Sequence, residues 1–322
     1  MILFFWQSAK VSILLRRLLV PTTIPDTPEP SSGLYIPLQL PGLRAAAGLW
    51  NVFILDLWGV IHDGVAAYPH SAETLRQLRA TGARVMLLSN APRRASALIT
   101  QMETMGIPRD LYDGILSSGD AVHHALLTRK DPAFAALGNT CFHLGPERDL
   151  TIYEETGVVL TDLDHATFIM NTGPVSLDDS ADDYRTMLAK GVQAGLPMVC
   201  ANPDRIVIRQ GKTIVCAGAL ADIYLEYGGT VIWRGKPDPA VYRLCLEKMG
   251  FPSTGVCTIG DSLETDMAGA AAAGIDGLWV TGGIHADEVG GAYGKPADPL
   301  RMARLAARHG VRPAAALAGF IW

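Results

Sequence analysis

The sequence has few cysteines, and they are not paired as metal or disulfide frameworks require. The five are odd in number and scattered along the chain: Cys141, Cys200, Cys216, Cys245 and Cys257. Structural zinc sites and disulfide-rich folds use closely spaced, matched cysteines. The sequence therefore predicts neither kind of framework, and a reducing, cytoplasmic setting fits it best.

An excess of positive charge is also lacking. The 27 Lys and Arg residues are outnumbered by 32 Asp and Glu residues, which leaves a net charge of −5. A protein that binds the phosphates of nucleic acid needs a basic surface. The composition therefore predicts no nucleic-acid partner.

No uninterrupted apolar run reaches the length of a membrane span. Residues 1–20 are apolar but are interrupted by Lys10, Arg16 and Arg17. A signal peptide carries its charges before the apolar run, which is not the order here. We therefore expect no firm membrane association.

Two interpretations of the N-terminus stay open. Residues 1–39 read as a poorly ordered extension, ending in a linker rich in Pro, Ser and Thr at 21–33. The alternative is a helix lying on a membrane surface, because apolar and basic residues are interleaved. In either case we expect the folded protein to begin near Leu40.

The chain does contain enough apolar material for two domains. It has 322 residues, of which 49% are hydrophobic and 18% are charged. This composition is typical of a globular protein, and the length exceeds what one core usually holds.

The stretch around which the chain is organised begins with a short apolar run that ends in an acid. Val52 to Leu55 consists of strand-forming residues and is followed at once by Asp56. This pattern is typical of a buried parallel strand that is followed by a loop. Ligand sites in open α/β sheets lie just outside the carboxyl ends of the strands. Asp56 is therefore placed where chemistry is expected.

Three later stretches also place polar residues at the end of a predicted strand or in a turn. The run 85–90 ends in Ser89 and Asn90, the turn 234–238 carries Lys236, and the run 256–266 contains Asp261 and Asp266. Singly, each has an ordinary explanation as a helix cap, a surface turn or a solvated acid. In this order over one chain, an active site is the better interpretation.

Together the four stretches resemble the motifs of the haloacid dehalogenase superfamily. The long segment between the Ser and Lys motifs resembles its class IIA phosphatases, and the turn Asn202-Pro203-Asp204 matches their cap. The resemblance implies an α/β fold: a Rossmann-like, doubly wound parallel sheet with an inserted α/β cap. We expect residues 40–130 and 230–322 to form the core, the latter beginning with the strand Val231-Ile232, and residues 131–229 to form the cap.

The resemblance also implies roles for the motif residues. Asp56 would attack phosphorus and form an aspartyl-phosphate. Mg²⁺ would be held by Asp56, Asp261 and the main-chain carbonyl of Trp58, with Asp266 binding it or orienting its ligands. Ser89, the backbone amide of Asn90 and Lys236 would bind the phosphoryl group.

Substrate selection is expected in the cap, because the core recognises only phosphate. The candidates there are Asn202, Asp204 and Arg205. Three basic residues, Arg205, Arg209 and Lys212, could contact a second anionic group of the substrate. The alternative is that they belong to a solvated hairpin.

One position departs from the family pattern. The second Asp of the first motif, which protonates the leaving oxygen, is replaced by Trp58, whose indole cannot act as acid or base. A good leaving group could make the acid unnecessary, or His62 or Asp63 could substitute for it. An aromatic residue here resembles a bacterial sub-branch of class IIA.

The predicted function is therefore a Mg²⁺-dependent phosphatase acting on a small phosphorylated metabolite. It is either slow or restricted to good leaving groups. The alternative is a non-hydrolytic protein that binds phosphorylated ligands on the same fold. A haloacid dehalogenase proper is disfavoured, because that chemistry has no need of the Asp261/Asp266 pair. A homodimer and a monomer both remain open.

Overall fold

The computed structural model describes residues 34–251 and 254–322. The interpretations of residues 1–33, as an extension with a linker or as a membrane-surface helix, lie outside the described residues. None of the described helices is long and apolar enough to cross a membrane.

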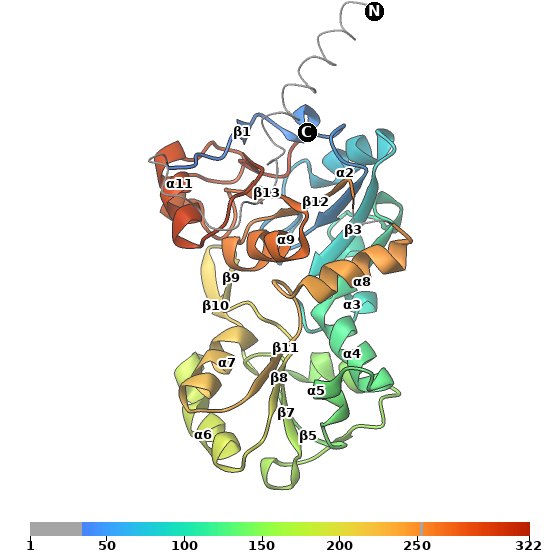
Figure 1. The fold of residues 1–322 in the computed structure, drawn as a ribbon, viewed down its shortest axis with the longest axis vertical. Helices are drawn as coiled ribbons and strands as arrows, with labels where there is room; N and C mark the ends of the chain where they lie inside the picture. The colour runs from blue at the N-terminus through green and yellow to red at the C-terminus, as the bar shows by residue number, and fades with distance from the viewer. Residues whose placement is uncertain (1–33, 252–253) are drawn as a thin grey trace, which may run out of the picture.

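The described chain forms two lobes, each built on a parallel sheet (Figure 1). The larger sheet has seven strands in the order β1-β14-β13-β12-β2-β3-β4. Its strands are β1 (Gln39–Leu40), β2 (Val52–Leu55), β3 (Arg84–Ser89), β4 (Gly114–Ser117), β12 (Val256–Gly260), β13 (Asp276–Val280) and β14 (Ala315–Leu317). We call this sheet with its helices the core.

Successive residues of β2 face opposite sides of the core sheet, as the two-residue period of a strand requires. Phe53 and Leu55 pack in one apolar cluster with α2 (Ser71–Ala80) and α3 (Ala95–Thr104). Val52 and Ile54 pack in another with α8 (Pro239–Met249). Helices therefore cover both faces, which explains why β2 reads as one continuous apolar run.

The described part of the core has seven further helical segments, of which α4 and α11 are the longest. They are the 3₁₀-helices η1 (Leu43–Ala45) and η2 (Arg109–Leu111), α4 (Ser118–Thr128), the π-helical turn η6 (Leu263–Met267), α9 (Ala268–Ala273), α10 (Ala286–Val289) and α11 (Pro299–Arg308). Helix α11 covers the end of the sheet, where its Met302 and Leu305 pack with Trp279 of β13.

The smaller sheet has five parallel strands in the order β11-β8-β7-β5-β6. These are β5 (Thr140–Leu144), β6 (Val159–Leu160), β7 (Phe168–Asn171), β8 (Met198–Cys200) and β11 (Val231–Trp233). Its helical segments are α5 (Pro132–Ala135), η3 (Glu147–Tyr153), η4 (Leu163–His165), η5 (Ala181–Tyr184), α6 (Arg185–Gln193) and α7 (Ala217–Glu226).

A separate antiparallel hairpin joins β9 (Ile206–Arg209) to β10 (Lys212–Val215). It projects from the smaller lobe toward the core (Figure 1). We call the five-stranded sheet, its helices and this hairpin the cap. The α/β fold with an inserted cap, predicted from the motifs, is confirmed.

Two elements at the junction differ from the sequence-based expectation. Val231 and Ile232 were expected to form a core strand, but they lie in β11, where Val231 pairs with Met198 of β8. Val122 and Leu126 of α4 pack on the cap sheet, in one cluster with Phe168. An apolar run shows that a segment is buried, and only tertiary pairing decides in which sheet.

The start of the described chain also differs from its expectation. Gln39 belongs to β1 and pairs with Ala316 of β14. The hydroxyl of Tyr35 donates to the carbonyl of Pro313 over 2.7 Å. Contact with the core therefore begins before Leu40.

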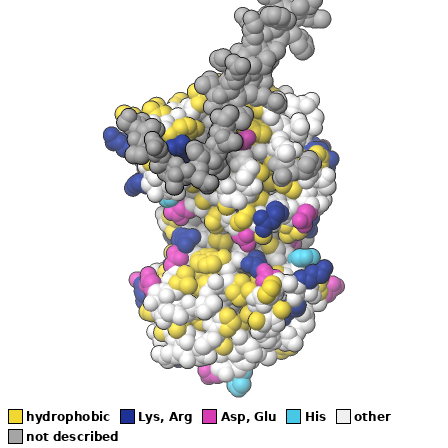
Figure 2. All heavy atoms as spheres, viewed as in Figure 1, with side chains coloured by type: hydrophobic (Ala, Val, Ile, Leu, Met, Phe, Trp, Pro, Cys, Tyr) yellow, Lys and Arg dark blue, Asp and Glu magenta, His cyan; other side chains and the backbone are white. Residues whose placement is uncertain are grey.

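Both signs of charge occur together on the face drawn in Figure 2. On the face drawn in Figure 2, Lys and Arg side chains are interspersed with Asp and Glu side chains. This matches the nearly balanced composition.

Candidate active site

The candidate site lies at the carboxyl edge of the core sheet, where β2 and β12 run side by side. Val256 pairs with Val52, and the backbone amide of Asp56 donates to the carbonyl of Ile259 over 2.9 Å. The two strands end together, one just before Asp56 and the other just before Asp261. Parallel pairing thus brings together two acids that are far apart in sequence.

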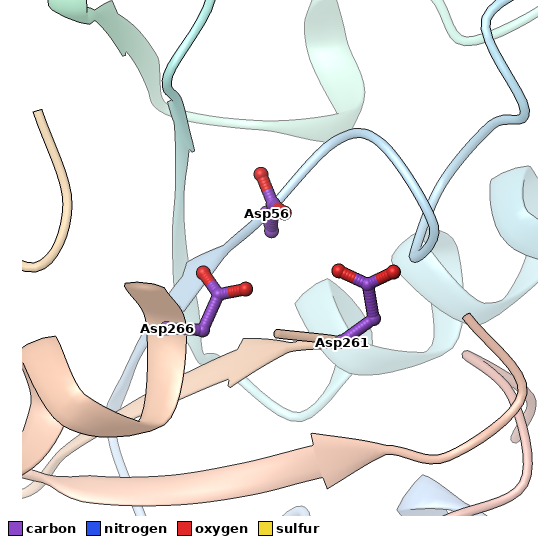
Figure 3. A group of neighbouring side chains, drawn as sticks. All are labelled: Asp56, Asp261 and Asp266. Atoms are coloured by element: carbon purple, nitrogen blue, oxygen red, sulfur yellow. The ribbon is translucent and has the colours of Figure 1, made fainter. Parts of the chain in front are cut away.

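A third acid, Asp266, joins them from the π-helical turn η6 that follows β12. Oxygens of Asp56, Asp261 and Asp266 all lie within 4.8 Å of one another, and the three side chains are buried. Their carboxyl groups converge on one space (Figure 3). Turns of π-helix are frequently found at functional sites.

The ammonium group of Lys236 lies against this cluster. Nζ of Lys236 is 2.7 Å from Oδ1 of Asp56 and 2.7 Å from Oδ1 of Asp266, and the Lys236 side chain is only 2% exposed. Burial acts to lower the pKa of Lys236, but the carboxylates of Asp266 and Asp56 outweigh it and raise that pKa well above its ordinary value. Lys236 is therefore charged at every physiological pH.

The cluster carries more negative charge than Lys236 can balance. Burial, with the negative charge of Asp266, raises the pKa of Asp56 well above its ordinary value. The same two causes raise the pKa of Asp261 to about 8. A buried, all-oxygen group with excess negative charge is the donor set that a hard divalent cation requires. The residues therefore fit Mg²⁺.

The backbone around Asp261 is shaped to hold its carboxylate. Oδ2 of Asp261 accepts a hydrogen bond of 2.7 Å from the amide of Ile284, and its carbonyl accepts one of 3.0 Å from the indole of Trp279. A Cβ at Gly59 would lie 1.9 Å from Oδ2, and Gly59 has a φ of +78°. Only glycine allows this loop to approach so closely.

A cleft of about 450 Å³ opens beside the acids, between the core edge and the cap hairpin. Both lobes contribute to its lining, which includes Asp56, Trp58, Tyr68, Asp204, Arg205, Ile206, Ile208, Asp261, Glu264, Asp287 and Tyr293. The cleft offers room for the organic part of a small ligand next to the acids.

Ser89 and Asn90 lie at the same edge, at the end of β3. Ser89 is buried, and its hydroxyl accepts the amide of Ala91 over 3.2 Å. Oδ1 of Asn90 accepts a hydrogen bond of 2.7 Å from the amide of Lys236. Nδ2 of Asn90 donates one of 2.8 Å to Oδ1 of Asp204. The side chain of Asn90 thus ties the lysine turn and the cap to β3.

Comparison with known proteins decides the family. Profiles described as haloacid dehalogenase-like hydrolase and HAD-hydrolase-like match residues 53–159 and 233–306. A solved hydrolase of the haloacid dehalogenase-like family from Brucella suis 1330 is 31% identical, covers 87% of this chain and 99% of its own, and has a TM-score of 0.74. This chain belongs to the haloacid dehalogenase-like hydrolases. The family predicted from the four motifs is confirmed.

More distant relatives include two proteins that are named as phosphatases. The p-nitrophenyl phosphatase from Archaeoglobus fulgidus is 20% identical with a TM-score of 0.65, over 84% of this chain and 97% of its own. The acid sugar phosphatase of Staphylococcus aureus is 20% identical over 241 residues, 73% of this chain and 88% of that protein. The class IIA arrangement is confirmed, whereas the aromatic sub-branch stays a prediction.

Within this hydrolase, Trp58 contacts the cap instead of standing free in the site. Its indole Nε1 donates to the carbonyl of Ile208 in β9 over 2.8 Å. Its ring meets that of His62 edge-on, with centroids 5.5 Å apart. Trp58 is therefore a hydrogen-bond donor between the two lobes.

Neither His62 nor Asp63 is arranged to act as the substitute acid. Nδ1 of His62 accepts the amide of Gly64 over 3.0 Å, and burial lowers the pKa of His62 to about 4. Asp63 accepts the amides of Val65 and Ala66, which help to lower its pKa although slight burial opposes them. At neutral pH, His62 is uncharged and Asp63 is ionised.

The cap residues proposed for substrate binding already have hydrogen-bond partners within the protein. Asn202 accepts the amide of Asp204 over 3.1 Å, and both lie at the turn toward the core. The guanidinium of Arg205 makes two hydrogen bonds of 3.0 Å with Asp222. Of these three, Asp204 and Arg205 line the cleft.

Lys212 and Arg209 lie at the tip of the hairpin and outside the cleft lining. Nζ of Lys212 is 2.5 Å from Oδ1 of Asp178, on an exposed surface of the cap. The arrangement favours a surface role for Lys212 over contact with a second anionic group.

Sequence reasoning missed an aromatic wall of the cleft. Tyr68 and Tyr293 stack with their ring centroids 3.8 Å apart, and the hydroxyl of Tyr293 donates to the carbonyl of Val60 over 2.8 Å. The two tyrosines come from opposite ends of the chain, and neither lies in a recognisable motif. No pattern in the sequence could have paired them.

Proposed function

We propose that this hydrolase is a Mg²⁺-dependent phosphatase that acts on a small phosphorylated metabolite. The observation that supports this most strongly is the group of three buried acids, Asp56, Asp261 and Asp266, with Lys236 at 2.7 Å from two of them. The relatives named acid sugar phosphatase and p-nitrophenyl phosphatase also favour phosphate esters as substrates.

Asp56 is the proposed nucleophile. Its carboxylate forms a bond to phosphorus while the ester oxygen departs, and water then releases phosphate from the aspartyl-phosphate and restores the carboxylate. When bound by Asp56, Asp261 and the carbonyl of Trp58, Mg²⁺ supplies the positive charge that lets two anions approach. The ammonium group of Lys236 favours the ionised form of Asp56, against the burial and the neighbouring Asp266 that raise its pKa.

Ser89 and the backbone amide of Asn90 are proposed to donate to the phosphoryl oxygens. Ser89 ends β3 and Asn90 follows it, beside the strand that leads into Asp56. Fixed donors that need not reorganise are an effective source of catalysis in phosphoryl transfer.

The rate of the proposed reaction depends on how readily the leaving group departs without a proton. The indole N–H of Trp58 is not acidic, His62 is uncharged at neutral pH, and Asp63 is ionised. A phenolate, or the carboxylate of an acyl phosphate, departs without a proton, whereas an alkoxide does not. A missing general acid costs about 10²–10⁴-fold in rate, so aryl and acyl phosphates should react far faster than sugar phosphates.

A panel of aryl, acyl and alkyl phosphates, assayed with Mg²⁺ and with EDTA, tests the proposal. We expect Mg²⁺-dependent release of phosphate from 4-nitrophenyl phosphate and acetyl phosphate. No turnover of any ester would favour the alternative, a non-hydrolytic phosphate-binding protein, for which Trp58 in place of the acid is the specific argument. Calorimetric titration with the same esters would then measure binding directly.

A further inference from the structure

The residue that replaces the family's acid makes a contact that an Asp side chain could not make. Trp58 follows the nucleophile strand by three residues, yet its indole reaches the cap hairpin, 2.8 Å from the carbonyl of Ile208. Aspartate is shorter and, when ionised, accepts hydrogen bonds only. The exchange of Asp for Trp therefore adds a bond between the lobes as well as removing an acid.

The core loop is built to hold the Trp58 ring in place. A Cβ at Gly64 would lie 2.2 Å from the six-membered ring of Trp58, so any larger residue would displace the indole. Gly64 also has a φ of +88°, which disfavours other residues. On another side the ring of His62 packs edge-on against the indole. The ring is thus fixed from the core before it meets the cap.

The cap hairpin needs an external partner. Its two strands, β9 and β10, pair only with each other in the described chain. An isolated two-stranded hairpin is marginally stable in water, and its outer edges leave backbone groups unpaired. The Ile208 carbonyl is one such group, and the Trp58 indole satisfies it.

The position of this hairpin determines the shape of the cleft. Ile206, Val207 and Ile208 line the cleft opposite Asp56 and Asp261. A shift of β9 would widen or close the space beside the nucleophile. The contact with Trp58 joins this wall to the loop that carries Asp56.

We infer that Trp58 is a positioning residue that fixes the β9–β10 hairpin over the cleft and so restricts which leaving groups fit beside Asp56. The effect on leaving groups rests on the proposed phosphatase function. The effect on the hairpin does not, and it can be measured without any turnover.

Limited trypsin digestion of the full chain tests the hairpin directly, because Arg209 and Lys212 flank its turn. Trp58→Phe keeps an aromatic ring and removes the donor. One hydrogen bond of ordinary strength corresponds to about fivefold in the population of detached hairpin, so cleavage after these residues should be about fivefold faster. Mass spectrometry of the fragments assigns the cleavage sites.

Trp50→Phe is the matched control. It also removes an indole donor, here bonded to Asp276 over 2.7 Å, far from the hairpin. Its cleavage rate after Arg209 and Lys212 should equal that of the wild type. Equal rates in Trp58→Phe, Trp50→Phe and the wild type would overturn the inference.

Two further measurements complete the test. In the wild type, the Trp58 indole N–H should exchange slowly with solvent by NMR, and fast exchange would overturn the inference even if Trp58→Phe does not fold. If the panel shows turnover, Trp58→Phe should change KM for bulky aryl phosphates more than for acetyl phosphate. Equal changes in KM would remove the effect on leaving groups and leave the hairpin result to stand on its own.

Discussion

Lys236 and Asp56 form an ion pair of 2.7 Å inside the protein, between the turn that enters α8 and the end of β2. The ammonium is shared with Asp266 at the same distance. One cation thus lies between two buried carboxylates, one from each of the two sequence segments that form the core. In the proposed mechanism, Lys236 therefore affects both catalysis and stability.

Lys236→Met should destabilise the protein strongly. The change leaves Asp56 and Asp266 buried without a positive partner, and breaking such a pair costs about 3–5 kcal/mol. Urea unfolding in EDTA should show this loss, and Mg²⁺ should recover part of it. Lys248→Met, on the exposed side of α8, should change the free energy of unfolding by less than about 0.5 kcal/mol. A similar small change for Lys236 would show that its charge is not needed.

Asp56→Asn should abolish turnover and leave the fold intact. Removing a nucleophile costs as much as about 10⁶-fold in kcat in well-studied hydrolases. The amide removes one of three crowded negative charges, so the metal-free variant should be no less stable than the wild type. Residual activity near the wild-type level would exclude Asp56 as the nucleophile.

Trp58→Asp should restore a general acid and raise the turnover of alkyl phosphates. Trp58→Asn is its control, because it loses the same ring and the same contact with Ile208 but cannot donate a proton as an acid. We expect the Asp variant to exceed the Asn variant by about 10²-fold on a sugar phosphate and to differ little on acetyl phosphate. Equal rates for the two variants would mean that the carboxyl group does not reach the leaving oxygen.

His62 should make the protein sensitive to acid. Burial lowers its pKa from 6.5 to about 4, so between these pH values the unfolded chain binds a proton that the folded chain does not. Stability from this residue is complete above pH 6.5 and is lost as the pH falls toward 4. Relative to His62→Gln, the wild type should lose about 3 kcal/mol across this window, measured by urea unfolding. A difference that stays constant with pH would show that His62 is not held uncharged.

The cap should be removable where the chain crosses between the lobes. A Cβ at Gly235 would lie 2.2 Å from Oγ of Ser118, so the two crossing points are adjacent. Deleting residues 119–234 and joining the ends with a short Gly-Ser linker should leave a core that unfolds cooperatively. This core should hydrolyse small esters with less discrimination than the full chain.

A narrower deletion serves as the comparison. Removing only residues 131–229 retains β11 without its sheet and exposes Val122 and Leu126 of α4, which pack on the cap. We expect this variant to aggregate or to melt lower than the wider deletion. The opposite ranking would place the domain boundary near residues 130 and 230.

Local patterns in the sequence were sufficient for the core and its acids. The apolar runs before Asp56 and Asp261 predict buried parallel strands, and the carboxyl ends of such strands meet at one edge. Strand β2 and helix α8 follow directly from apolar periodicity and a Pro after Asp238. These features depend on neighbours in sequence, which is why the sequence determined them.

Only the tertiary structure decided how the lobes meet. The sequence of Val231 and Ile232 predicts a buried strand in either sheet. An apolar pattern does not show whether that strand pairs with a core strand or with β8. From the sequence, Trp58 shows only that the usual acid is missing. Its hydrogen bond to Ile208 depends on the position of the cap hairpin in the folded protein. Such contacts join residues that share no local pattern, so their free energy is gained only when both lobes are folded.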